Sequence, residues 1–175
     1  NLPRNWCRGM AGGLIAFASD SQITGCFASG NVQGSEASSA YSGGLLAACG
    51  ASGTGLHSMT INRCYAKGNV AGYTVGGLIG NISPSYGSVT VSNCYARGNV
   101  EGESNTGGFV GEVLTFGQPN EMAYLQNCYC TGDATSAMPW GSGGFGGWYY
   151  GEATITSCFW NNENNHNSND FYDLD

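Results

Sequence analysis

The sequence predicts an all-β chain that folds as a parallel β-solenoid (a β-helix) of about five rungs with a C-terminal cap. Three observations predict this class: a composition rich in glycine and poor in charge, a Gly-Gly-apolar motif that recurs along the chain, and a Cys-aromatic motif that alternates with it. Because both motifs return in a fixed order, each interval between them corresponds to one structural repeat.

Glycine contributes 30 of the 175 residues, and only 10% of the residues are charged, where about 25% is usual in soluble domains. Hydrophobic residues make up 41%, without a run of the roughly 18–20 apolar residues that a membrane helix requires. This combination is typical of packed β structure with many tight turns. The net charge of −7 disfavours anionic partners, so we expect neither nucleic acid binding nor membrane insertion. Because the chain starts at Asn1 without an initiator Met, we expect a processed mature form or a piece of a longer protein.

The first motif consists of two glycines followed by apolar residues. Its successive copies begin 31, 33, 31 and 36 residues apart. Glycine and β-branched residues without a 3.6-residue period favour a strand that leaves a tight turn, and not a helix. The five copies are Gly12-Gly13-Leu14-Ile15-Ala16, Gly43-Gly44-Leu45-Leu46-Ala47, Gly76-Gly77-Leu78-Ile79-Gly80, Gly107-Gly108-Phe109-Val110-Gly111 and Gly143-Gly144-Phe145-Gly146-Gly147.

The second motif places a cysteine immediately before an aromatic residue. A Gly-Asn-Val-like step follows it in four repeats, beginning at Gly30, Gly68, Gly98 and Gly132. Glycine and asparagine at this step indicate a turn between strands. The five copies are Ile23-Thr24-Gly25-Cys26-Phe27, Ile61-Asn62-Arg63-Cys64-Tyr65, Val91-Ser92-Asn93-Cys94-Tyr95, Leu125-Gln126-Asn127-Cys128-Tyr129 and Ile155-Thr156-Ser157-Cys158-Phe159.

We expect each repeat to form three short strands, with neighbouring rungs about 4.8 Å apart. The chain is predicted to be a single solenoid domain, residues 1–175. Within it, residues 1–11 form an N-terminal cap or lead-in, residues 12–160 the repeats, and residues 161–175 a polar C-terminal tail. Trp160 replaces the small residue of earlier repeats, and its indole is expected to close the end of the core beneath the tail.

Alternation along a strand assigns the two faces of the Cys-aromatic motif. In the third copy, Cys94 shares a face with Ala96, and Tyr95 shares the opposite face with Arg97. A charged side chain is costly in a solenoid interior, so the cysteines are predicted to point inward and the aromatic residues outward. The inward row comprises Cys26, Cys64, Cys94, Cys128 and Cys158.

The outward aromatic stripe is the candidate ligand-binding site. Flat rings beside polar side chains suit a sugar ring or a partner protein. The alternative is that the rings stabilise the stacked rungs by packing on one another, without any ligand. The candidate residues are Phe27, Tyr65, Tyr95, Tyr129 and Phe159, with Lys67 and Arg97 beside them.

The chain has eight cysteines, an even number that invites a disulfide framework. Cysteines stacked at a rung spacing of about 4.8 Å exceed the roughly 3.8 Å Cβ separation of a disulfide, so the inward row is predicted to be buried thiols. A disulfide, if one forms, is expected between Cys7 and Cys49, which lie off the row. The spacing of Cys128 and Cys130 is too short for the usual zinc-binding pair, and no metal site is predicted.

No set of catalytic residues stands out in the sequence. His57 and His166 stand alone, one in a long loop and one in the tail, and nothing resembles a nucleophile–base pair. We therefore expect no enzyme activity, no cofactor and no metal. The acidic residues of the repeats are interpreted mostly as solvated turn carboxylates. They include Glu36, Glu101, Glu103, Glu112 and Asp133.

The two motifs together resemble the GLUG-motif repeat, as in Gly76-Gly77-Leu78-Ile79-Gly80 followed by Asn93-Cys94-Tyr95-Ala96-Arg97-Gly98-Asn99-Val100. The resemblance extends from about Gly12 to Trp160. GLUG repeats occur in large bacterial surface proteins, including adhesin-like chains and non-catalytic regions of IgA-peptidase-type proteins. The resemblance therefore implies a β-solenoid that is secreted or displayed on a bacterial cell surface, and it carries no catalytic residue. The pattern is broken at Ala16, Ala47 and Gly146 and by the extra cysteines.

Three functions from different classes remain open at this point, because a fold does not by itself imply a function. The first is a non-catalytic binding or display module of an adhesin type, with a glycan or a host protein as ligand. The second is a self-assembling structural unit of an extracellular filament or surface layer, in which the ends of the solenoid associate. The third is a carbohydrate-active β-helix enzyme.

Overall fold

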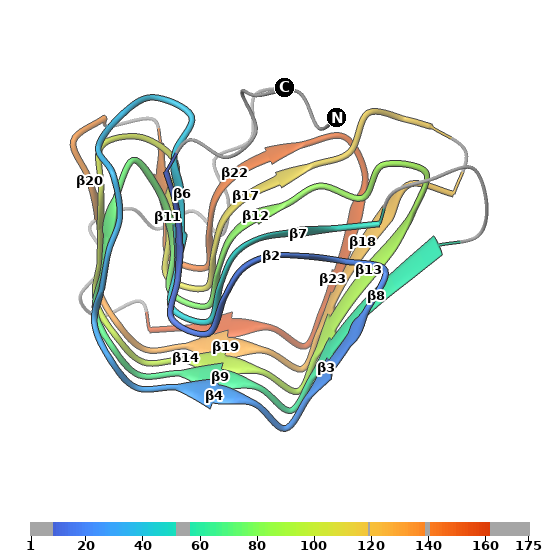
Figure 1. Cartoon of the computed structure of the whole chain (residues 1–175), viewed down its shortest axis with the longest axis horizontal. Coiled ribbons are helices and arrows are strands. Elements are labelled where there is room, and N and C mark those ends of the chain that lie inside the picture. Colours follow the sequence, from blue (N-terminus) through green and yellow to red (C-terminus); the bar gives the residue numbers. More distant parts are fainter. Residues whose placement is uncertain (1–8, 52–56, 119, 139–140, 162–175) are drawn as a thin grey trace.

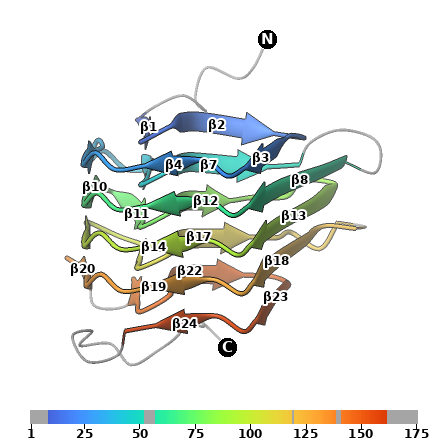
Figure 2. The same cartoon turned by 90° about the horizontal axis from the view of Figure 1, so that it is seen from below.

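A computed structural model describes residues 9–51, 57–118, 120–138 and 141–161. These residues form strands and turns without a helix, and the strands wind into a parallel β-solenoid, as predicted (Figure 1). Four of its sheets contain five strands and one contains four, which corresponds to about four complete turns and a partial fifth. The chain runs clockwise in Figure 1 as it moves away from the viewer, and Figure 2 shows the same direction, so the coil is right-handed.

Each repeat contributes five short strands, and not the three predicted from the sequence. The difference arises because both motifs span a corner. The first glycine of each pair ends one strand, and the second lies in the corner before the next strand. The residue that precedes each row cysteine also lies between two strands. A run that reads as one strand in the sequence is therefore divided between two sheets. We number the sheets 1 to 5 in the order in which the chain enters them.

Sheets 1 and 2 meet at the Gly-Gly corner, and all their strand pairs are parallel. Sheet 1 contains β1 (Met10–Gly12), β6 (Tyr41–Gly43), β11 (Thr74–Gly76), β16 (Thr106–Gly107) and β21 (Ser142–Gly143). Sheet 2 contains β2 (Ile15–Ser19), β7 (Leu46–Gly50), β12 (Ile79–Ile82), β17 (Val110–Leu114) and β22 (Gly146–Tyr150).

Sheets 3 and 4 meet at the corner before the row cysteines, and sheet 5 follows the Gly-Asn-Val step. Sheet 3 contains β3 (Gln22–Thr24), β8 (His57–Asn62), β13 (Gly87–Ser92), β18 (Met122–Gln126) and β23 (Ala153–Thr156). Sheet 4 contains β4 (Phe27–Ala28), β9 (Tyr65–Ala66), β14 (Tyr95–Ala96), β19 (Tyr129–Cys130) and β24 (Phe159–Trp160). Sheet 5 contains β5 (Val32–Gln33), β10 (Val70–Gly72), β15 (Val100–Gly102) and β20 (Ala134–Ser136).

The interior is divided into two apolar clusters. The main cluster fills the space enclosed by sheets 2, 3 and 4, with Leu46, Ile61 and Cys94 among its buried members. A smaller cluster of valines, including Val70 and Val75, lies between sheets 5 and 1. Sheets 1 and 5 thus form a separate lobe beside the main body, which Figure 1 shows on its left-hand side.

The Gly-Gly corner is glycine-rich because backbone from neighbouring rungs passes too close for a side chain. A Cβ on Gly76 would collide with the carbonyl oxygen of Ile79 in its own turn. A Cβ on Gly77 would collide with the carbonyl oxygen of Gly108 in the next rung and lie 3.0 Å from the Cβ of Ala96 on sheet 4. The second glycine of each pair therefore packs against the residue that follows the Cys-aromatic pair on sheet 4.

The corner before each row cysteine needs a left-handed backbone. The residue there has φ between 53° and 68° in all five rungs. Glycine and asparagine adopt this region more readily than other residues, which explains Gly25, Asn93 and Asn127. Arg63 and Ser157 occupy the same conformation with φ of 56° and 54°.

The inward row of the Cys-aromatic motif is confirmed. Cys64, Cys94 and Cys128 are at most 1% exposed, and Cys26 and Cys158, in the first and last rungs, are half-buried. Trp160 is half-buried and packs against the main cluster, as predicted. The C-terminal tail that was expected to cover it lies outside the described residues.

Candidate ligand-binding surface

The aromatic stripe runs along the outer face of sheet 4 as an almost parallel stack of rings. Ring centroids are 5.1 Å apart between Phe27 and Tyr65, 4.7 Å between Tyr65 and Tyr95, and 5.1 Å between Tyr95 and Tyr129. The interplanar angles are 9°, 3° and 10°. In-register pairing of the strands imposes this spacing and places Phe159 opposite Tyr129.

This stacking determines what the stripe can offer a ligand. Both faces of Tyr65 and of Tyr95 are covered by neighbouring rings, so their edges and hydroxyl groups are what remains exposed. A sugar that stacks on a ring needs a ring face, and the inner rings have none left. The packing of rings between neighbouring rungs is therefore observed. That the aromatic stripe binds a ligand stays a prediction.

The two cations of the stripe contact the rings beside them. The Nζ of Lys67 lies 5.0 Å from the ring centroid of Tyr65, and the guanidinium carbon of Arg97 lies 5.0 Å from that of Tyr95. Arg97 also donates a hydrogen bond of 3.2 Å to the hydroxyl of Tyr129. These contacts hold both cations near the corner between sheets 4 and 5.

The outer face of sheet 5 is hollowed, a feature that was not predicted from the sequence. Two adjoining cavities of about 410 Å³ and 450 Å³ open on it. They share a row of in-register residues, one from each strand of the sheet, and together they form the sheet-5 groove. The shared residues are Gln33, Ala71, Glu101 and Thr135.

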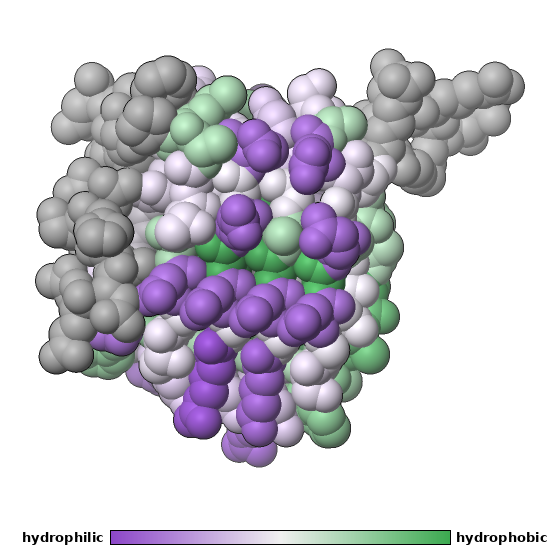
Figure 3. All heavy atoms as spheres, turned by 90° about the vertical axis from the view of Figure 1, so that its left-hand side faces the viewer, coloured by the Kyte–Doolittle hydropathy of each residue, from purple (hydrophilic) through white to green (hydrophobic). Residues whose placement is uncertain are grey.

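One wall of the sheet-5 groove is a polar ladder. In three successive rungs, a backbone N–H donates to the side-chain oxygen of the asparagine in the rung before. Asn69 donates to Asn31 and Asn99 donates to Asn69, both at 3.0 Å. Asp133 donates to Asn99 at 3.1 Å. The ladder explains the asparagine of the Gly-Asn-Val step, because only a short side-chain carbonyl reaches the next rung. Figure 3 looks onto this face, where a row of hydrophilic side chains borders a strip of hydrophobic ones.

Acidic side chains gather in the groove. Glu36, Glu101 and Glu103 line one cavity, and Asp133 lines the other with Glu101. Glu36, Glu103 and Asp133 lie between strands, as expected for turn carboxylates, and Glu101 lies on β15. The solenoid turns bring these residues from different repeats onto one face, which was not foreseen. Neither cavity is lined by Lys, Arg or His. The groove is therefore suited to neutral or amine-bearing groups and unsuited to anions.

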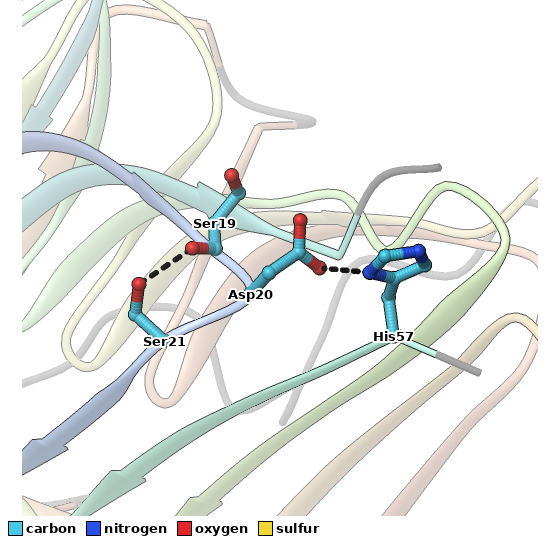
Figure 4. Close-up of polar contacts among 4 residues, drawn as sticks. All are labelled: Ser19, Asp20, Ser21 and His57. Carbon is cyan, nitrogen blue, oxygen red and sulfur yellow. Dashed lines mark hydrogen bonds and ion pairs between the residues drawn. The ribbon is translucent and has the colours of Figure 1, made fainter. Parts of the chain in front are cut away.

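His57 does not stand alone, contrary to the prediction. Its Nδ1 lies 3.4 Å from Oδ1 of Asp20, which sits in the turn between β2 and β3 of the preceding rung (Figure 4). Ser21, next in the chain, donates to the carbonyl oxygen of Ser19 at 2.6 Å and not to the imidazole (Figure 4). The pair therefore bridges two rungs, and the Ser21 hydroxyl is not directed at the imidazole. His166 lies outside the described residues.

Glu112 is not a turn residue but a buried one on β17, with 4% of its surface exposed. Its Oε1 accepts a hydrogen bond of 2.7 Å from Asn81, and its Oε2 accepts one of 2.8 Å from Asn105. Burial raises the pKa of this carboxyl, and the hydrogen bonds from Asn105, Asn81 and Tyr41 oppose the rise. The pKa of Tyr41 is raised in turn by burial and by the nearby Glu112 carboxyl. With its lone pairs engaged by neutral donors, Glu112 holds sheets 1 and 2 together.

The thiols of the inward row donate to backbone carbonyl groups. Cys94 lies 3.1 Å from the carbonyl oxygen of Ser92, and Cys128 lies 3.2 Å from that of Gln126. Burial raises the pKa of Cys49 and that of Cys130 to about 12. Cys49 is a buried free thiol, and Cys7 lies outside the described residues, so their pairing stays a prediction.

Within the described ranges, no three His, Cys, Asp or Glu side chains are grouped so that they could hold a metal ion. A search of the same ranges for a helix long and apolar enough to cross a membrane finds none.

Comparison with known families gives one match. The family model described as "The GLUG motif" matches residues 8–33, which include the first Gly-Gly and Cys-aromatic motifs. No curated protein and no solved structure matches the chain. The chain therefore carries a GLUG motif in its first repeat, and its five copies of the pattern on a β-solenoid are consistent with a GLUG-repeat protein.

Proposed function

We propose that the chain is a non-catalytic binding or display module of a secreted or surface-anchored bacterial protein, of the adhesin type. The observation that carries the proposal is the sheet-5 groove, which extends over four rungs beside the aromatic stripe. A rigid stack with an elongated polar hollow fits a chain-like ligand laid along the solenoid axis.

The lining of the groove favours a glycan over a host protein. Protein interfaces depend on aromatic or arginine anchors that enter apolar pockets, and neither cavity is lined by an aromatic residue. The groove instead presents amide, hydroxyl and carboxylate groups, which pair with sugar hydroxyls and amines. Because no basic side chain lines the groove, we propose neutral or amino oligosaccharides as ligands, and not acidic ones.

The catalytic alternative has less support from the geometry. A carbohydrate-active β-helix enzyme needs a general acid or base poised beside its substrate. Glu112 is buried with both oxygens hydrogen-bonded, and His57 is paired with Asp20 away from the sheet-5 groove. The groove carboxylates line an open polar hollow without a paired base.

The proposal is tested by binding the purified chain to an array of neutral, amino and acidic oligosaccharides, with extracellular matrix proteins as a second panel. The groove variant combines Gln33→Ala with Glu101→Ala, and the stripe variant combines Tyr65→Ala with Tyr95→Ala. The matched control combines Gln126→Ala with Glu152→Ala, which removes the same two residue types at exposed positions outside the groove.

We expect binding to neutral or amino oligosaccharides that weakens by about tenfold or more in the groove variant, since each lost polar contact costs roughly 1 kcal/mol. The control should bind as the original chain does. Loss of binding in the stripe variant alone would move the site to sheet 4, and binding only to matrix proteins would replace the glycan as ligand. A chain that binds neither panel contradicts the proposal.

A further inference from the structure

The two ends of the solenoid carry most of the large hydrophobic side chains that remain exposed. Of nine such residues among the described ones, six belong to the first or the last rung. Exposed hydrophobic side chains at both ends of a repeat stack indicate surfaces that bind another protein surface. The six are Leu14, Phe17 and Phe27 in the first rung and Tyr150, Ile155 and Phe159 in the last.

The backbone of sheet 4 is complementary between its two ends. Tyr65 and Lys67 donate their N–H groups to the carbonyl oxygens of Cys26 and Ala28 in the rung before, both at 3.1 Å. The same pattern repeats in every rung, down to Phe159, which donates to Cys128 at 3.0 Å. Within sheet 4, each strand therefore donates toward the N-terminal end and accepts from the C-terminal side.

Extending this pattern past the ends shows what each end presents. The N–H groups of Phe27 and Ser29 point beyond the first rung, where the described chain has no further strand to accept them. The carbonyl groups of Cys158 and Trp160 point beyond the last rung of sheet 4. In sheet 4, the first rung thus offers donors and the last rung acceptors, at equivalent positions of the repeat.

The aromatic stripe continues the same complementarity in its side chains. The rings from Phe27 to Tyr129 stack at 4.7–5.1 Å, and among the described residues Phe27 has a ring neighbour on one side only. Phe27 is 57% exposed and Phe159, at the other end of the row, is 67% exposed. A second copy placed in register would put Phe159 of one copy on Phe27 of the next.

The end strands also lack the features that usually prevent such pairing. Soluble proteins protect edge strands with charged residues, proline or bulges. The first-rung strands β3 and β4 and the last-rung strands β23 and β24 contain no charged residue and no proline. Nothing in these four strands opposes the addition of another rung.

From these observations we propose that the chain associates head to tail with a second copy of itself. The C-terminal edge of sheet 4 in one copy pairs with the N-terminal edge of sheet 4 in the next, so that the carbonyl groups of Cys158 and Trp160 accept from Phe27 and Ser29 across the junction. The contact is heterologous, and repetition of it extends the solenoid into a filament. This activity is separate from ligand binding on the groove, because it uses the ends and not the lateral face.

Sedimentation of the full chain over a dilution series tests the proposal. The original chain should show a weight-average mass that rises with concentration beyond twice the monomer mass. Phe27→Asp and Phe159→Asp each place a charge at one end and should sediment as monomers. Phe116→Asp is the matched control, because Phe116 is as exposed as Phe27 but lies between β17 and β18, and it should associate as the original chain does.

A mixture of the two end variants separates head-to-tail association from any other mode. The Phe27→Asp copy keeps an intact C-terminal end, and the Phe159→Asp copy keeps an intact N-terminal end, so the mixture should form dimers and stop there. Circular dichroism of each variant confirms that it is folded. The proposal is overturned if the original chain stays monomeric at every concentration, whatever covers its ends. It is also overturned if association survives in both single variants or grows past dimers in the mixture.

Discussion

The carboxyl group of Glu112 is removed from water and bound by neutral donors, which makes its ionisation unfavourable in the folded state. Part of the free-energy cost of burying the carboxylate is offset by hydrogen bonds from Asn81, Asn105 and Tyr41, none of which brings a positive charge. A buried carboxylate without a cationic partner loses more solvation than neutral hydrogen bonds return. Its pKa is therefore raised in the folded chain relative to the unfolded one.

The raised pKa of Glu112 gives a pH dependence of stability with a definite sign. The stabilising contribution of Glu112 is fully present below its pKa in the unfolded chain, about 4.3, and is lost as the pH rises through its pKa in the folded chain. The free energy of unfolding falls by about 1.4 kcal/mol for each unit by which the two pKa values differ. Glu112→Gln removes this ionisation, so the variant should gain stability relative to the original chain between pH 4 and pH 8. Urea unfolding of both proteins across this range measures the difference.

An exposed carboxylate provides the control for this measurement. Glu101→Gln changes the same functional group on the surface of sheet 5, where solvent is available in both states. A pH dependence of the stability difference in Glu112→Gln no larger than that in this variant would show that burial does not shift the ionisation of Glu112.

At the scale of strands, the Gly-Gly corner determines how closely sheet 4 approaches the beginning of sheet 2. Ala28, Ala66 and Ala96 fill the space that the missing Cβ atoms of Gly13, Gly44 and Gly77 leave open. In the last two rungs larger residues, Cys130 and Trp160, take the alanine position. The corner therefore tolerates change on the sheet-4 side but little on the glycine side, where backbone meets backbone.

Gly77→Ala tests this contact, because its Cβ would collide with the carbonyl oxygen of Gly108 and press on Ala96. We expect a loss of about 3 kcal/mol or more in the free energy of unfolding, at the upper end of overpacking costs, since backbone cannot move aside as a side chain can. Gly30→Ala is the control: a Cβ there meets nothing within 4 Å. It should change stability by less than about 1 kcal/mol. Equal effects in chemical denaturation would refute the close-packing explanation.

The repeats and the two faces of the Cys-aromatic motif were predictable because the sequence contains five copies of each position, whereas the division of each repeat into five strands was not. Cysteine inward and aromatic outward followed from alternation alone, and burial of Cys94 confirms it. The sheet-5 groove was not predictable, because it depends on how sheets 5 and 1 form a separate lobe. Glu36 and Glu101 line one cavity only because two turns of the solenoid align them. The contact of Asp20 with His57 has the same origin.

For the whole molecule, the rungs form a one-dimensional stack in which each contacts only its neighbours. Stability in such a stack is close to a sum of rung terms and interface terms, and the end rungs lack one interface each. Opening is therefore expected to begin at the ends, as the half-buried Cys26 and Cys158 already indicate. The row of cysteines places one reporter in every rung at an equivalent position.

Alkylation of the native chain can follow this opening rung by rung. A thiol reacts as its thiolate and only when accessible, so Cys26 and Cys158 should be modified first, Cys64 and Cys128 more slowly, and Cys94 last. Mass spectrometry of peptides from timed samples gives each rate, and the urea-unfolded chain supplies the intrinsic reactivity of each site. Equal rates at Cys64, Cys94 and Cys128 would mean that the solenoid opens in one global step. A rate at Cys94 that exceeds those at Cys64 and Cys128 after correction for intrinsic reactivity would contradict opening from the ends.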